Sequence, residues 1–260
     1  MPAIEYLLDD LAAESAELDA LVADLSDADW QRDTPADGWT VADQIAHLAW
    51  TDDIALLAVA EPDRLRQLSA GFRPNLIDAT AHEGAATAPN ELLVRWRAGR
   101  TALSHALRGV PAGATLPWIG VTMGAPSMVT ARIMETWAHG QDIADTLSVH
   151  RRPTARLRHV AHLGVATRDF AFRLHGQDPP GAPFRVELVG PENDCWTWGP
   201  DDAPQRVTGL ALDFCLLVTQ RRNRDDLAVQ AAGPDAEAWL SLAQAFAGAP
   251  GPGRPKASTP

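Results

Sequence analysis

One carboxylate and two imidazoles are the residues of this sequence most suited to chemistry. Glu135 and His139 stand four residues apart in the stretch ARIMETWAHGQD, so a helix places both side chains on one face. Such a pair could be a helix-surface ion pair, a buried polar pair or two metal ligands. His47, in WTVADQIAHLAW, could supply a third ligand from a second helix, although a lone histidine there could equally be a hydrogen-bonded core residue. Two imidazoles and one carboxylate leave a coordination position open, as in catalytic zinc sites.

The elements that must position these residues are predicted to be four long amphipathic helices. Apolar residues recur at helical spacing, and Thr40 with Asp43 resembles a capping box. Asn90 and Ser127 are the expected N-caps of the third and fourth helices. The four predicted helices cover residues 4–25, 41–60, 91–109 and 128–149. They indicate a bundle whose core can hold a site built from facing helices.

The second half of the chain has a different pattern, which predicts a smaller α+β part. Short alternating runs, FRVELVG, CWTWG, RVTG and LAVQAAG, are typical of strands, and helical patterns surround them. The fold class is therefore mainly α with a smaller α+β part. The predicted divisions are a metal-binding bundle over residues 1–152, an α+β domain over 153–248 and a disordered Pro/Gly-rich tail over 249–260.

Composition restricts the partners. A net charge of −12 and a pI near 5.0 disfavour binding to nucleic acid, which needs clustered cations. No apolar stretch approaches the length of a membrane span and the first residues do not resemble a signal peptide, so no membrane partner and a cytoplasmic location are expected. Cys195 and Cys215 are interpreted as packing residues. Lysine occurs only at Lys256 while arginine is plentiful, which suggests a GC-rich, actinobacterial genome.

Two stretches together carry a family resemblance. GWTVADQIAHL and ETWAHGQDIAD resemble the DinB-like metal-binding superfamily, and more closely its branch containing mycothiol-dependent maleylpyruvate isomerase; the resemblance covers most of the chain. It implies a DinB-like four-helix bundle with His47, Glu135 and His139 as zinc ligands. It also implies that Arg221, with Arg222 adjacent, points from the C-terminal domain toward the metal. The alternative is that Arg221 interacts with exposed carbonyls at a helix C-terminus.

Other residues near the motifs are candidates for supporting roles. Asp142, one turn after His139, could accept its second ring N–H, and Gln44, one turn before His47, is a similar candidate. The stretch WIGVTMGAPS and the residues HEG at 82–84 do not fit the isomerase pattern. The substrate of the isomerase therefore need not apply to this chain.

The function predicted from the sequence is a zinc-dependent enzyme. A low-molecular-weight thiol, mycothiol, would be the metal-activated nucleophile for S-transfer to, or cis–trans isomerisation of, a small electrophile, with Arg221 pairing with a substrate carboxylate. One alternative is a zinc-dependent hydrolase that uses bound water. A second is a non-catalytic protein that binds a small molecule or a metal, whose zinc position would be closed by a fourth protein ligand. The sequence does not predict the oligomeric state.

Overall fold

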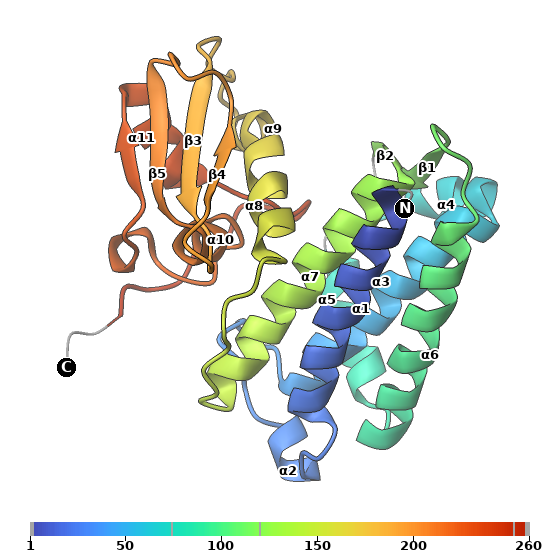
Figure 1. Ribbon diagram of the computed structural model, residues 1–260. Helices are drawn as coiled ribbons and strands as arrows, with labels where there is room; N and C mark the ends of the chain where they lie inside the picture. The colour runs from blue at the N-terminus through green and yellow to red at the C-terminus, as the bar shows by residue number, and fades with distance from the viewer. Residues whose placement is uncertain (1–2, 74, 120, 252, 258–260) are drawn as a thin grey trace. The chain divides into compact units, whose positions relative to one another are not determined.

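Two compact units make up the chain in a computed structural model that describes residues 3–73, 75–119, 121–251 and 253–257 (Figure 1). The first unit is Met1–His150 and the second is Arg151–Pro260. The first is mainly helical and the second combines helices with a four-stranded sheet. The predicted fold class, mainly α with a smaller α+β part, is confirmed.

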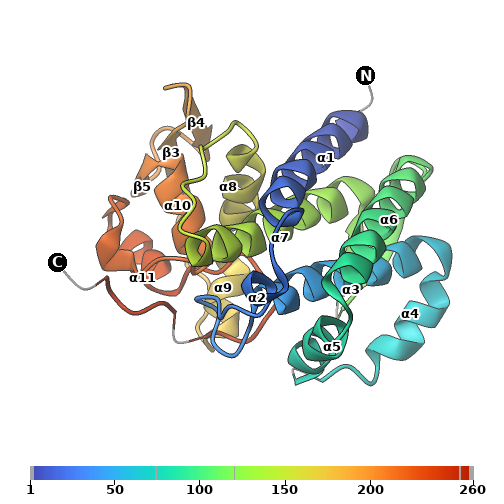
Figure 2. The ribbon, with the colours of Figure 1, turned by 90° about the horizontal axis from the view of Figure 1, so that it is seen from below.

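Four long helices form the bundle of the first unit: α1 (Ala3–Val22), α3 (Val41–Ala60), α6 (Pro89–Arg108) and α7 (Ala125–Thr146). Helix α3 packs against both α6 and α7, and α1 packs along α7 (Figure 2). Their buried faces meet in two apolar clusters, one around Ile45 and Trp96 and the other around Leu103 and Ile133. The shorter elements among the described residues of this unit are α2 (Asp27–Trp30), α4 (Pro62–Ser69), α5 (Asn75–Ala85), β1 (Thr115–Trp118) and β2 (Val121–Gly124).

The start of α3 is fixed by the predicted capping box. The Thr40 hydroxyl accepts a hydrogen bond from the Asp43 backbone N–H at 3.3 Å, and the Asp43 carboxylate accepts one from the Thr40 N–H at 2.8 Å. The caps predicted for the other helices were wrong. Helix α6 is preceded by Ala88 rather than beginning after Asn90, and α7 is preceded by Gly124 rather than Ser127. A proline stands in the first turn of each, where its fixed φ suits helix initiation without a side-chain cap.

Two segments between the predicted long helices form ordered elements. The segment between the third and fourth helices contains a hairpin, in which β1 pairs antiparallel with β2 and Leu116 lies opposite Met123. Leu116 is buried in the second apolar cluster, with Met123 packed against it. Helix α5 forms between the second and third predicted helices and lies along α3. Burial against the bundle stabilises both elements, and the short local pattern carries no sign of that burial.

The second unit is a sheet with helices. Its strands are β3 (Phe184–Val189), β4 (Cys195–Trp198), β5 (Gln205–Leu210) and β6 (Gln230–Ala232), in the order β4-β3-β5-β6. Only the β3–β5 pair is parallel among these described strands. The remaining elements are α8 (Leu157–Ala166), α9 (Arg168–Leu174), α10 (Ala211–Val218), the 3₁₀ turn η1 (Arg224–Asp226) and α11 (Pro234–Leu242).

The two cysteines differ in their surroundings. Both are free; Cys215 is buried in α10 as predicted, whereas Cys195 is exposed on β4, so its interpretation as a packing residue was wrong.

In the predicted tail, the Ala257 N–H donates to the Asp226 carboxylate at 2.8 Å, and the Lys256 Nζ lies 3.4 Å from the Asp225 carboxylate. Within the described ranges, no helix has both the length and the apolar character needed to cross a bilayer.

Candidate metal centre

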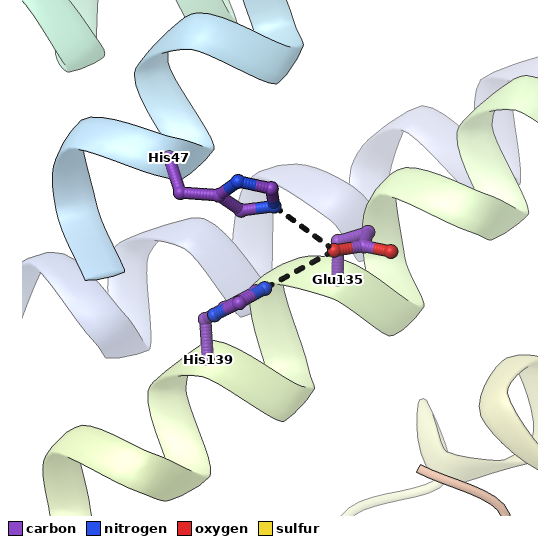
Figure 3. Close-up of side chains that lie close together, drawn as sticks. All are labelled: His47, Glu135 and His139. Carbon is purple, nitrogen blue, oxygen red and sulfur yellow. Dashed lines mark hydrogen bonds and ion pairs between the residues drawn. The ribbon is translucent and has the colours of Figure 1, made fainter. Parts of the chain in front are cut away.

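The structure brings together the three side chains that the sequence proposed as metal ligands. His47 projects from α3, while Glu135 and His139 project from α7, and one ligand atom of each lies within 4.8 Å of the others (Figure 3). His47 and His139 are buried, and the Glu135 side chain is 23% exposed. The site is therefore built from two helices of one unit and remains partly open at the carboxylate.

The distances suit a small divalent ion. One carboxylate oxygen of Glu135 lies 3.2 Å from Nε2 of His139 and 3.5 Å from Nε2 of His47, so both nitrogens face the same oxygen (Figure 3). Tetrahedral ligands with zinc bonds of about 2.0–2.1 Å are separated from one another by about 3.3 Å. The two nitrogen–oxygen distances are close to this spacing, and all three ligand atoms lie within 4.8 Å of one another, so the residues fit a zinc ion.

The charge of Glu135 is held by the two histidines. Burial works against ionisation of this carboxyl, but hydrogen bonds and charge interactions with His139 and His47 outweigh it, and the pKa lies well below its ordinary value. The carboxylate is therefore ionised at neutral pH, which is the form that binds a metal.

Gln44 orients His139 from the facing helix. Its side-chain carbonyl oxygen accepts a hydrogen bond from Nδ1 of His139, while its amide donates to the Thr34 hydroxyl at 2.8 Å. Thr34 in turn donates to the Trp39 carbonyl oxygen at 2.8 Å. Because Nδ1 keeps its hydrogen for Gln44, loss of the Nε2 hydrogen on metal binding would leave the Nε2 lone pair facing the ligand cluster. From the sequence, Asp142 was the candidate partner of His139, and Gln44 was the candidate partner of His47. In the structure Gln44 is the hydrogen-bond partner of His139.

Aromatic rings border both histidines. Trp39 stacks on His139 with centroids 5.8 Å apart and lies 5.2 Å from the His47 ring. Trp50, one turn after His47, lies 6.2 Å away and itself stacks on Phe72 at 6.1 Å. The Nδ1 atom of His47 is buried without a hydrogen-bond partner in the part of the chain that the structure describes. Ring packing therefore holds His47, where a hydrogen bond holds His139.

Helix α5 forms a wall beside the site, and the HEG segment belongs to it. His82 contacts the Asp43 carboxylate at 2.7 Å, and the Trp39 indole N–H donates to Asp78 at 3.0 Å. Gly84 allows close approach, because a Cβ there would lie 2.8 Å from the Cβ of Ala46. Sequence reasoning missed this role, since the only local signal was one glycine within a short amphipathic stretch.

A buried ion pair joins the two helices that carry the ligands. Nε of Arg132 on α7 donates to the Asp52 carboxylate on α3 at 2.8 Å, and both residues are buried. Burial raises the pKa of Asp52, and the guanidinium opposes that rise. Both terminal nitrogens of Arg132 are buried without a hydrogen-bond partner among the described residues. The pair therefore depends on a single direct contact.

Arg221 lies in the second unit, just after α10. Its Nη1 donates to the Thr219 carbonyl oxygen at 2.7 Å, which agrees with the interpretation as a helix C-terminal contact. The Arg222 guanidinium donates to the Arg221 carbonyl oxygen at 2.7 Å. A role for Arg221 toward the metal or a substrate stays a prediction.

Comparisons with known proteins give relatives for both units. Residues 11–144 match the family described as the mycothiol maleylpyruvate isomerase N-terminal domain, and residues 180–231 match a family described as wyosine base formation. Uncharacterized proteins from two strains of Mycobacterium tuberculosis, CDC 1551 and H37Rv, are each 55% identical over 248 residues, covering 94% of this chain and 96% of theirs.

Solved structures share the fold. Crystal structures of mycothiol-dependent maleylpyruvate isomerase and of a histidine-to-alanine variant of that enzyme align with TM-scores of 0.60 and 0.59. Each alignment covers 90% of this chain and 96% of the other, at 17% and 16% sequence identity. The likeness at this identity is one of fold.

Proposed function

The chain belongs to the mycothiol maleylpyruvate isomerase N-terminal domain family, and from this we propose that it is a zinc-dependent enzyme that uses mycothiol as a nucleophile. The reaction is S-transfer to, or cis–trans isomerisation of, a small electrophile. The observation that carries the proposal is the cluster of His47, Glu135 and His139, whose ligand atoms lie within 4.8 Å of one another. A zinc ion held by three protein ligands would keep a further position for a reactant.

The metal and the thiol have distinct parts. A zinc ion held by these three side chains would act as a Lewis acid that keeps a thiol ionised at neutral pH. The chain's own residues prepare the site for it. Glu135 supplies a negative charge that persists at neutral pH, and Gln44 accepts the Nδ1 hydrogen of His139, so that Nε2 is the nitrogen that would bind the metal. Trp39 covers the His139 ring and limits access of water from that side.

The proposed chemistry is conjugate addition. The thiolate sulfur forms a bond to one carbon of an activated cis double bond, and the alkene electron pair moves into the adjacent carbonyl. Rotation about the new single bond and expulsion of the thiolate restore the double bond as the trans isomer. In a transferase the adduct instead takes up a proton and is released. Arg221 is proposed to pair with a substrate carboxylate, for which the guanidinium fork is suited.

Purified zinc-loaded protein with mycothiol tests this function. Formation of the trans isomer from maleylpyruvate, or of a thioether from a model electrophile, is expected and should be lost in His139→Ala. Substrate consumption that continues without any thiol would support the zinc hydrolase instead. No turnover with either class of electrophile, although zinc is bound at one equivalent, would reject the proposed enzyme.

A further inference from the structure

A stacked ring pair lies next to the candidate metal centre. Trp50 of α3 and Phe72, which follows α4, have centroids 6.1 Å apart and an interplanar angle of 24°. The Trp50 ring also lies 6.2 Å from the ring of His47. Trp50 stands three residues after His47, so both project from nearby positions on one helix face.

Both rings keep an intermediate exposure. Among the described residues, neither ring is a member of the two apolar clusters of the bundle. A partly exposed stack beside the candidate metal centre leaves apolar ring surface that a ligand could cover. The neighbouring wall is firm, because Trp39 is hydrogen-bonded to Asp78 and His82 contacts Asp43.

We infer that Trp50 and Phe72 form a binding surface for the electrophile and select one that carries a planar, conjugated ring. This inference rests on the proposed thiol-dependent function and adds the substrate class. Planar rings gain most from offset stacking on indole and phenyl faces, whereas an acyclic electrophile cannot cover the same surface. For a ring bearing a leaving group, the thiolate sulfur bonds to the substituted carbon, the leaving group departs with the bonding electrons, and the thiol proton passes to solvent.

The test compares ring and acyclic electrophiles. Zinc-loaded wild type, Trp50→Leu and Phe72→Leu are assayed with mycothiol and either 1-chloro-2,4-dinitrobenzene or acrylamide. Each variant should raise KM for the ring substrate by roughly 2- to 10-fold, and KM for acrylamide and for mycothiol should stay constant. Phe170→Leu is the control, because Phe170 is 38% exposed and lies in the second unit. Phe72 lies outside any helix, so its variant keeps the test valid if Trp50→Leu folds poorly.

A second readout separates failure of the inference from failure of the function. Saturation-transfer NMR titration with unreactive 1,3-dinitrobenzene measures ring binding without turnover. Weaker binding in both variants but not in Phe170→Leu supports the inference, even if no thiol chemistry is found. Equal binding in all proteins overturns it, as does a change confined to KM for mycothiol, which would place the thiol on this surface. If zinc-loaded protein shows no turnover but ring binding is weakened in both variants, the proposed function is rejected and the ring-binding surface is kept.

Discussion

Gln44 on α3 accepts the Nδ1 hydrogen of His139 on α7, and so one helix determines the tautomer of the other helix's candidate ligand. The two helices that supply ligands are thereby linked at the ligand itself. His47 has no equivalent hydrogen bond among the described residues and is held by rings. The two histidines should therefore respond differently when their surroundings are altered.

Replacing Gln44 by Ala should weaken zinc binding by about 10- to 100-fold, because the His139 ring loses the partner that fixes its tautomer and orientation. Competition with a chromogenic chelator measures the affinity. Gln141→Ala is the matched control, since Gln141 lies on α7 and its side-chain amide donates to Asp145, away from the ligand cluster's own hydrogen bonds. Equal affinities in the two variants would remove Gln44 from the site.

His47→Ala and His139→Ala should each lose most of the bound metal while the bundle stays folded. Each change removes one of three ligands, and the helices are stabilised mainly by the apolar clusters. Elemental analysis of dialysed protein together with far-ultraviolet circular dichroism measures both properties. His105→Ala, on the exposed side of α6, should retain the metal. Full metal content in both ligand variants would show that any metal is bound elsewhere.

The sequence was sufficient to predict the bundle and the Glu135–His139 pair, because long helices and an i, i+4 spacing are local properties. His47 stands on another helix, and its place in the cluster was implied by the family resemblance. The sequence was not sufficient for the partners of those side chains. Gln44 reaches His139 only because α3 faces α7, and α5 covers the site through Gly84, whose importance depends on a contact with Ala46 across two helices. Such contacts arise from the packing of helices against one another. The presence of a glycine or a glutamine at one position of a sequence does not reveal them.

Gly84→Ala should destabilise the first unit. The new Cβ would lie 2.8 Å from that of Ala46, so α5 must move away from α3, at a cost of about 1–3 kcal/mol that exceeds the gain in helix propensity of up to about 1 kcal/mol. Gly99→Ala is the control, because it is also within a helix and its Cβ would meet nothing closer than 3.5 Å. Thermal unfolding should show a lower Tm for the first variant and an unchanged or higher Tm for the second. The opposite order would mean that α5 does not pack as described.

Asp19 should make stability depend on acid pH. The hydrogen bond from Arg97 is the largest influence on the pKa of this carboxyl; burial opposes it, and the hydrogen bond and charge of Arg100 help to keep the pKa below its ordinary 3.8. A group with a lowered folded pKa contributes stability above its unfolded pKa and loses it as the pH falls through the folded pKa. Asp19→Asn should therefore cost about 1 kcal/mol at pH 7 and progressively less below about pH 4. Urea unfolding across this range measures the difference, and a constant difference would contradict the assignment.

The Arg132–Asp52 pair should behave as a buried link whose halves depend on each other. Arg132→Met leaves the Asp52 carboxylate buried without its guanidinium, and the expected loss is about 3–5 kcal/mol in the free energy of unfolding. Adding Asp52→Leu removes the stranded charge, so the double variant should recover much of that loss. Urea unfolding of the wild type, the two single variants Arg132→Met and Asp52→Leu, and the double variant gives the coupling energy. Zinc titration of the double variant separates stability from metal binding. If the double variant regains stability but binds zinc more weakly, the pair sets the spacing of α3 and α7 at the ligands. If the losses in unfolding free energy are additive and the zinc affinity is unchanged, the two residues act independently of each other and of the site.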